Sequence, residues 1–409
     1  DIWGPLLNGG RVVVIDHQTL LDPNAFGHEL SASGATVLFV TTALFNQYVQ
    51  LIPQALKGLR ILLCGGERGD PAAFRRLLAE APALRIVHCY GPTETTTYAT
   101  TFEVREVAEN AESVPIGAPI SNTQVYVLDA HQQPVPMGVT GELYIGGQGV
   151  ALGYLNRADL TTEKFLQDPF SEQPGALLYR TGDLARWLAP GQLDCIGRND
   201  DQVKIRGFRI ELGEIEARLH EQPELRDAAV SVQEGVNGKH LVGYLVAHQG
   251  VSADAALLEQ VKQRLRAALP EYMVPLHWGW FDSLPHNANG KLDRKALPAI
   301  DIGGHYSQAY QAPRNELEDV LAGIWADVLK AERVGVHDNF FELGGHSLLA
   351  TQIASRVQKQ LQLNVPLRAM FECSTVEALA EYVQGLQGSA LDDDKVDRLS
   401  DLMAELEGL

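Results

Sequence analysis

One serine stands where a bulky anionic group could be attached to the chain. Ser347 follows Gly344-Gly345 and precedes Leu348-Leu349, so it lies where a loop turns into an apolar helix. Serine is favoured at the start of a helix, where its hydroxyl faces water, and a phosphodiester there would lie beside the partly positive helix N-terminus. A serine that only caps the helix is the alternative. The preceding run Asp338-Asn339-Phe340-Phe341-Glu342-Leu343 shifts the balance toward attachment.

Two polar runs follow strand-like segments. Tyr90-Gly91-Pro92-Thr93-Glu94-Thr95-Thr96 comes after residues 85–87, and Gly65-Gly66-Glu67 comes after residues 59–63. Ligands bind at the carboxyl ends of strands in open α/β sheets. Threonine hydroxyls can hold phosphate oxygens, one glutamate can supply a ligand to Mg²⁺, and glycines let a flat ligand approach the backbone. Each run alone is also compatible with an ordinary loop.

Two later runs complete a possible nucleotide site. Tyr179-Arg180-Thr181-Gly182-Asp183-Leu184 places Asp183 after a tight turn, where its carboxylate could accept hydrogen bonds from two ribose hydroxyls. Residues 197–207, which begin Gly-Arg-Asn-Asp-Asp, follow closely. The order of these runs along the chain carries more weight than any one of them.

The first half of the chain must supply the elements that position these runs. Residues 1–120 alternate β-rich and helical stretches, which predicts a parallel sheet. The expected strands are Arg11–Ile15, Thr36–Val40, Leu59–Leu63 and Arg85–Val87, with a helix at Pro71–Glu80. From 121 to 198, strands such as Gln124–Leu128 and Gly141–Gly147 alternate with Gly-rich turns, which predicts a small β-barrel or sandwich.

The second half predicts four further parts. Residues 199–297 combine strands at Val203–Ile205, Ala228–Val232 and Leu241–Ala247 with helices at Leu212–Glu221 and Ala253–Leu269, as in a compact α+β domain. Residues 298–312 read as a linker, and helical patterns at 315–330, 347–361 and 375–387 predict a small bundle over 313–387. Residues 388–409 predict an acidic amphipathic helix, either a linker to a following module or a docking helix.

Composition narrows the possible partners. The 409 residues carry a formal net charge of −19, which argues against nucleic acid or an anionic membrane. The four cysteines form no C-x-x-C pair, so neither a zinc site nor a disulfide framework is expected, and a cytoplasmic location fits best. No membrane helix or leader is expected, and the start at Asp1, already within a helix-like pattern, is expected to be a fragment boundary.

The chain resembles nonribosomal peptide synthetases over almost its whole length. Residues 313–387 resemble the peptidyl carrier (thiolation) domains of these synthetases, in which the serine that matches Ser347 carries 4'-phosphopantetheine. The other runs resemble, in order, the signature motifs of their adenylation domains. That likeness continues through Gly141–Gly147, Gly207–Glu216, Leu269–Pro275 and Asn289–Arg294.

The resemblance implies a multidomain α/β and α+β fold. Residues 1–198 correspond to the C-terminal part of an adenylation core, with a parallel βα layer (1–120) and a small β-barrel (121–198). Residues 199–297 correspond to the small mobile adenylation subdomain, and 313–387 to a helical-bundle carrier.

The resemblance also implies residue roles. Thr93 would contact phosphate, Glu94 would help hold Mg²⁺, and Lys291 would bridge the substrate carboxylate and the α-phosphate of ATP. Asp200 would be the hinge that exchanges Lys291 for the segment around Gly207 between adenylation and thioester formation. The residues implied to bind ATP or AMP are Gly65, Gly66, Glu67, Tyr90, Gly91, Thr93, Asp183, Arg198 and Lys291.

Substrate and partners follow from the same comparison. The family's pocket positions map to Phe39, Leu63, Gly65, Cys89, Thr97 and Tyr98, with Lys291 completing the set. These are mostly apolar, which predicts an aliphatic amino acid such as leucine, valine or isoleucine. His346 is typical of carriers that feed a condensation step with an L-residue. The implied partners are a phosphopantetheinyl transferase and neighbouring condensation or other synthetase domains.

The chain departs from the family pattern in three places. The phosphate loop that normally lies upstream is absent, so the first half of the adenylation core is expected to be missing; Leu152 replaces the usual arginine, and Ala158 a frequent proline. Two functions therefore stay open: an enzyme that activates and loads an amino acid, and a catalytically incomplete module that only presents a loaded arm. A stand-alone acyl- or aryl-CoA ligase is disfavoured, because it has no reason to carry the Ser347 run.

Overall fold

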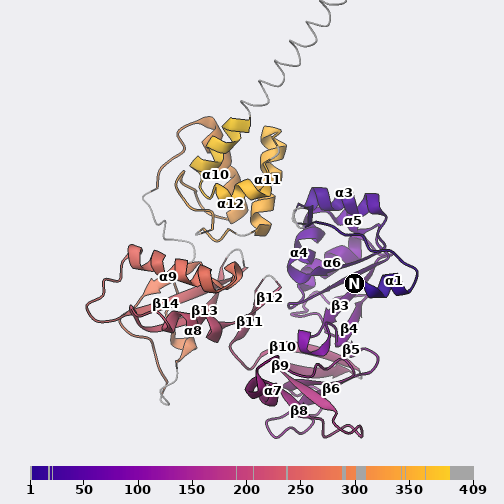
Figure 1. The fold of residues 1–409 in the computed structure, drawn as a ribbon. Helices are drawn as coiled ribbons and strands as arrows, with labels where there is room; N and C mark the ends of the chain where they lie inside the picture. Colours follow the sequence, from indigo (N-terminus) through magenta and orange to yellow (C-terminus); the bar gives the residue numbers. More distant parts are fainter. Residues whose placement is uncertain are drawn as a thin grey trace, which may run out of the picture. The chain divides into compact units, whose positions relative to one another are not determined.

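The computed structural model describes residues 2–16, 19–20, 22–189, 191–205, 207–235, 238–287, 292–300, 310–341, 343–345, 347–363 and 365–386 (Figure 1). The chain divides into two compact units, the first Asp1–Val14 with Ala25–Glu211 and the second Ile15–Asn24 with Leu212–Leu409. Residues 199–211 thus group with the first unit, because the hairpin they contain bonds to it. The boundary at 198/199 between the adenylation core and the small subdomain remains a prediction.

A mixed sheet forms the first layer of the first unit. Its strands, in spatial order, are β1 (Val37–Thr41), β2 (Ile61–Gly65), β3 (Arg85–Tyr90), β4 (Thr100–Val104) and β5 (Ala118–Pro119). β1, β2 and β3 are parallel, as predicted, whereas β4 and β5 pair antiparallel. The accompanying helices are α1 (Trp3–Leu7), α3 (Pro23–Ser33), α4 (Thr42–Leu51), α5 (Pro53–Leu56) and α6 (Pro71–Glu80).

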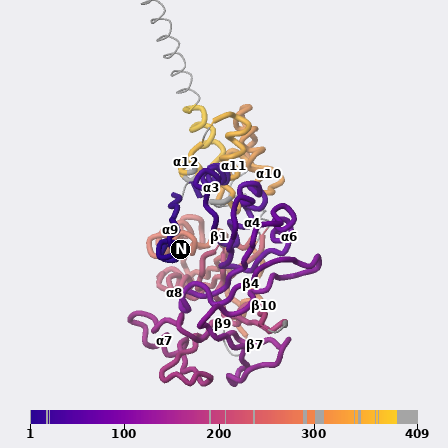
Figure 2. The backbone as a smooth tube through the Cα atoms, turned by 90° about the vertical axis from the view of Figure 1, so that its right-hand side faces the viewer, coloured from indigo at the N-terminus to yellow at the C-terminus, as the bar shows by residue number. Residues whose placement is uncertain are grey.

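Helices α4 and α6 lie side by side against this sheet (Figure 2). Both begin at capped positions, where the side chains of Thr41 and Asp70 accept hydrogen bonds from the first-turn amides. The rings of Phe45 and Phe74 meet at 4.6 Å between centroids and are fully buried. This packing fixes the carboxyl ends of β1 and β2, where the predicted site residues begin.

An antiparallel half-barrel forms the second layer. Its strands are β6 (Thr123–Leu128), β7 (Gly141–Gly147), β8 (Phe165–Gln167), β9 (Leu177–Ala189) and β10 (Gln192–Arg198), with α7 (Ala158–Lys164) between β7 and β8. The order is β10-β9-β7-β6, and β8 pairs with β9. A two-stranded hairpin, β11 (Gln202–Ile205) and β12 (Phe208–Glu211), follows β10.

The second unit contains an α+β part and a helical part. The first comprises α8 (Leu212–His220), β13 (Leu225–Gly235), β14 (Gly238–Ala247), α9 (Ala255–Ala268) and β15 (His277–Trp280), with its sheet in the order β13-β14-β15. The second comprises α10 (Glu316–Leu329), α11 (Ser347–Leu361), α12 (Leu367–Glu372) and a helix at 376–386. Trp325 and Phe340 are fully buried in the core of the helical part.

Two details differ from the sequence-based expectation. Residues 11–15 form no strand, and Val14 is 88% exposed, because no described strand pairs with them. Helix α12 was not predicted; it follows Pro366, which is compatible with a helix start, and its apolar positions are too few for a periodic signal. Among the described residues, no helix is long and apolar enough to cross a membrane.

Candidate active site

The predicted loop after β3 folds tightly at the carboxyl end of the parallel strands. Thr93–Thr95 form a single 3₁₀ turn, and Thr96 and Thr97 adopt left-handed backbone angles. A Cβ at position 91 would lie 2.6 Å from the carbonyl oxygen of Thr97, so only glycine fits where the loop returns. Gly65 is equally constrained, because a Cβ there would lie 2.2 Å from the carbonyl oxygen of Cys89.

Four of the predicted pocket residues share one face of the sheet. The register pairs Phe39 with Leu63 and Gly65 with Cys89, and residues two apart on a strand point to the same side. The ring of Tyr98 lies 5.6 Å from that of Phe39. Burial raises the pKa of the Cys89 thiol to about 12, so the thiol is neutral at pH 7. The side chains gathered on this face are therefore uncharged.

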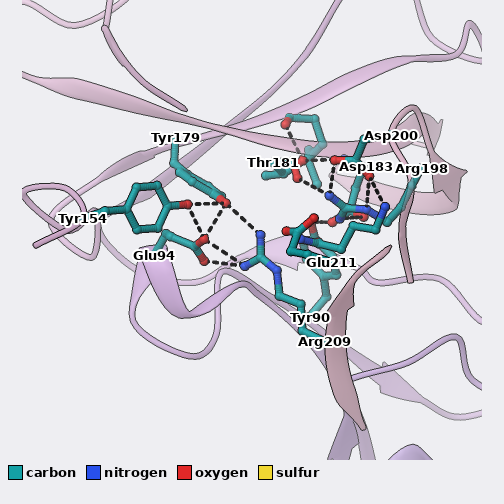
Figure 3. Close-up of polar contacts among 12 residues, drawn as sticks. Tyr90, Glu94, Tyr154, Tyr179, Thr181, Asp183, Arg198, Asp200, Arg209 and Glu211 are labelled. Carbon is teal, nitrogen blue, oxygen red and sulfur yellow. Dashed lines mark hydrogen bonds and ion pairs between the residues drawn. The ribbon is translucent and has the colours of Figure 1, made fainter. Parts of the chain in front are cut away.

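The Asp183 carboxylate is held from two sides. Tyr90 Oη donates to its Oδ2 over 2.5 Å, and Arg198 Nη1 donates to its Oδ1 over 2.6 Å (Figure 3). The same guanidinium donates to both carboxylate oxygens of Asp200 over 2.7 Å, and to the backbone oxygen of Thr181 over 3.0 Å. Burial lowers the pKa of Arg198, but the bond to Asp200 and the charge of Asp183 outweigh it, so the pKa rises. The structure thus joins Asp183, Arg198 and Asp200, all selected from sequence.

The predicted tight turn before Asp183 is wrong: residues 177–189 form one strand, β9, with a register irregularity opposite Glu142–Tyr144, and this irregularity requires glycine at position 182. Gly182 has φ +75°, and a Cβ there would lie 2.5 Å from Asp200 Oδ2 and 2.7 Å from Arg198 Nη2. The backbone amide of Asp183 donates to Thr181 Oγ1 over 2.9 Å. A carboxylate presented at such a strand irregularity suits the ribose of a nucleotide, with Arg198 beside it to meet anionic oxygens.

A second carboxylate, Glu94, lies in a cluster of polar groups that is also drawn in Figure 3. Tyr154 and Tyr179 donate their hydroxyls to Oε1 over 2.6 and 2.7 Å. Arg209 Nη1 donates to Oε1 over 2.8 Å and to Oε2 over 2.7 Å. Burial raises the pKa of Glu94, but the Tyr154 bond, the Arg209 charge and the Tyr179 bond outweigh it, so the pKa lies below its ordinary value. The group is ionised at neutral pH.

Glu94 supplies a single carboxylate, and this limits how a magnesium ion could bind here. Within the described part of the chain, no group of three or more His, Cys, Asp or Glu side chains could hold a metal. One ionised carboxylate is sufficient for an ion that keeps several waters and takes its other ligands from substrate phosphates, as Mg²⁺ commonly does. Glu94 could therefore hold Mg²⁺ together with a nucleotide.

The β11–β12 hairpin lies against the same edge of the first sheet. The backbone amide of Gly207 donates to the carboxylate of Glu67, and a Cβ at this glycine would lie 3.1 Å from Thr41 Cγ2. Lys204 Nζ lies 5.6 Å from the centre of the Tyr90 ring, a cation–π distance. Sequence reasoning selected Gly207 and Glu67 for this edge.

Four residues of the site were missed. Tyr154 lies in the loop before α7, Tyr179 lies on β9, and Lys204 and Arg209 pair within the β11–β12 hairpin, so these three segments meet only in three dimensions. Strand alternation is a signal that could have found Tyr179, since Tyr179, Thr181 and Asp183 are two residues apart on one strand.

Two of the predicted functional residues lie wholly or partly outside the described part of the chain. Lys291 lies outside the described residues, as do Asn289 and Gly290. Ser347 is the first residue of the 15-residue helix α11, as predicted, but its side chain is outside the description.

Comparisons with known proteins match three stretches of the chain. Residues 1–155 match the family profile of AMP-binding enzymes, residues 214–291 match the AMP-binding enzyme C-terminal domain, and residues 319–383 match the phosphopantetheine attachment site. Malpibaldin synthetase of Mortierella alpina is 48% identical over 395 residues, which are 97% of this chain and 7% of that protein. Bacitracin synthase 3 of Bacillus licheniformis is 43% identical over 390 residues, 95% of this chain and 6% of that protein. The chain thus spans less than a tenth of these relatives.

One solved structure with adenylation and carrier domains is similar to this chain. The holo form of PA1221, a nonribosomal peptide synthetase protein with adenylation and carrier domains bound to a vinylsulfonamide inhibitor, is 33% identical with a TM-score of 0.72. The match covers 94% of this chain and 63% of that one.

Proposed function

The chain belongs to the nonribosomal peptide synthetases, with an adenylation part followed by a carrier part, and from this premise we propose that it activates an amino acid with ATP and loads it as a thioester onto Ser347. The observation that carries the proposal is the polar site at the carboxyl end of β3, where ionised Glu94 follows the strand and buried Asp183 accepts a bond from Tyr90. The carrier helix α11 begins at Ser347. An aliphatic L-amino acid is the proposed substrate. The apolar face of Phe39, Leu63 and Cys89 supports it.

The residues divide the chemistry between them. Asp183 and Arg198 orient the ribose, Thr93 contacts the phosphates, and Glu94 holds Mg²⁺. Lys291 neutralises charge while the substrate carboxylate attacks the α-phosphorus and pyrophosphate leaves. When bound, Mg²⁺ adds positive charge at the phosphates, and the phosphopantetheine arm supplies the thiol that accepts the aminoacyl group. A pivot at Asp200 then replaces Lys291 by the Gly207 segment, and the contact of Gly207 with Glu67 supports that second arrangement.

We place this activity in the cytoplasm, between a phosphopantetheinyl transferase that modifies Ser347 and neighbouring condensation domains that use the product. The four cysteines are free thiols, which supports a reducing location.

Intact-mass spectrometry tests the function. The protein is incubated with a phosphopantetheinyl transferase and coenzyme A, then with ATP, Mg²⁺ and mixed amino acids. An arm on Ser347 followed by an aminoacyl increment supports the proposal, and the increment identifies the amino acid. Ser347→Ala is expected to gain neither mass. An arm without an aminoacyl increment would instead support the module that only presents a loaded arm, and no arm on the folded protein would exclude the carrier assignment.

A further inference from the structure

The β11–β12 hairpin depends on the rest of the first unit for its position. It has only two strands, with Lys204 opposite Arg209, and an isolated two-stranded hairpin is marginally stable in water. Two of its attachments are to carboxylates: Gly207 bonds to Glu67 and Arg209 bonds to Glu94. These two bonds tie the hairpin to the rest of the first unit.

Arg209 binds the Glu94 carboxylate oxygen that would be open to a metal ion, Oε2. The two tyrosine hydroxyls both approach Oε1, whereas Oε2 accepts from Arg209 over 2.7 Å. The Glu94 side chain is 9% exposed and that of Arg209 is 34% exposed, so solvent screens this direct ion pair only in part. A Mg²⁺ ion about 2.1 Å from Oε2 would lie within about 5 Å of the guanidinium, and the two cations would repel each other in this partly buried site.

We propose that Arg209 and Mg²⁺ are alternative partners of Glu94, so that the hairpin docks fully only when the metal has left. The inference rests on the proposed function, in which Glu94 holds Mg²⁺ during adenylation. Arg209 then acts as a positioning residue: it takes over the charge-neutralising role of the metal and ties the hairpin, with Gly207, to the site. The hairpin thus responds to the loss of metal and pyrophosphate after the first half-reaction.

Competition for one carboxylate has a reciprocal consequence. If Mg²⁺ weakens hairpin docking, then docking weakens Mg²⁺ binding by the same factor. Removing Arg209 is therefore expected to tighten metal binding. A side chain with a purely structural role at the hairpin would not have this effect.

The test measures hairpin protection and metal binding on the whole chain. Hydrogen–deuterium exchange of peptides that cover the hairpin is followed through a Mg²⁺ titration, with and without ATP. Mn²⁺ then replaces Mg²⁺, and free Mn²⁺ is measured by electron paramagnetic resonance. In the unsubstituted protein, we expect a protected hairpin without metal and faster exchange as Mg²⁺ rises.

Three variants make the result specific. Arg209→Gln is expected to exchange fast without metal and to bind Mn²⁺ about 5- to 150-fold more tightly, the usual range of coupling between two sites. Glu94→Gln keeps the side-chain shape but loses the charge, so its hairpin is expected to ignore Mg²⁺. Arg186→Gln is the matched control, because Arg186 also pairs with a buried carboxylate, that of Asp194 at 3.1 Å, but lies in the half-barrel and not in the hairpin.

Two results would overturn the inference. The first is that the exchange rate of the hairpin in the unsubstituted protein does not change with Mg²⁺, and the second is that Arg209→Gln binds Mn²⁺ no more tightly than Arg186→Gln does. Thioester loading is read by intact mass on the same samples. Failed loading with a normal metal response counts against the proposed function alone, whereas normal loading without a metal response counts against the competition alone.

Discussion

The role of Asp183 in nucleotide binding can be measured, because Asp194 is a similar carboxylate that can serve as a control. Both are buried carboxylates in the half-barrel, and each pairs with one arginine of that sheet. Asp183→Asn is expected to weaken AMP binding about 10- to 100-fold, the loss of a charged hydrogen bond of about 1.5–3 kcal/mol to the ribose. Isothermal titration calorimetry measures it.

Asp194→Asn provides the control. It also removes the charge that pairs with Arg186 and weakens the 2.8 Å bond from Ser113, so both variants are expected to lower the unfolding temperature. AMP affinity is expected to fall only in Asp183→Asn. Equal losses of affinity in the two variants would mean that Asp183 acts through stability and not through the ribose.

The residues of the site differ in how far sequence could find them. Asp183, Arg198 and Asp200 lie within 17 positions of one another in the sequence, so a local run already contains these three residues. Arg209 and Glu94 are 115 positions apart. Their contact depends on where the hairpin packs, and neither composition nor periodicity contains that information.

At the scale of elements, one arginine joins two helices of the carrier part. Arg314 bonds to Glu318 in α10 over 2.7 Å and to Glu377 in the helix 376–386 at 2.7 Å. The hydrogen bond from Arg314 lowers the pKa of Glu318 more than burial raises it. Because the folded-state pKa is depressed, the pair stabilises the fold above the ordinary pKa of the carboxyl, and this stability is lost as pH falls through the folded-state value.

Glu318→Gln tests this pH dependence. At pH 7 the amides of α10 and 376–386 are expected to exchange about three- to tenfold faster in the variant, as for a loss of roughly 1 kcal/mol. The ratio of variant to unsubstituted rates should approach one as pH falls below the ordinary glutamate pKa of about 4.3. A ratio that stays constant with pH would show that the charge of Glu318 contributes nothing.

Single helices were easier to predict from the sequence than the pairing of strands. Pro71–Glu80 was predicted with the bounds observed for α6, because Asp70 caps it and Pro71 starts it. Residues 11–15 have the composition of a strand, yet they form none, because a strand also requires a neighbour to pair with. Periodicity describes one segment at a time, and pairing is a property of two.

For the whole molecule, the proposed pivot at Asp200 predicts that two substitutions separate the half-reactions. Lys291→Ala should lose amino-acid-dependent pyrophosphate exchange by about 100-fold or more, as for removal of one strong electrostatic stabiliser, yet still transfer from a supplied aminoacyl-adenylate. Gly207→Ala should do the reverse. Its φ of +84° disfavours any side chain, and the added Cβ would press on Thr41, so the hairpin would dock poorly while exchange continues. Both reactions are measured for each variant, relative to the unsubstituted protein. If each variant loses both reactions, then one rigid conformation performs both half-reactions, and Asp200 is not a pivot.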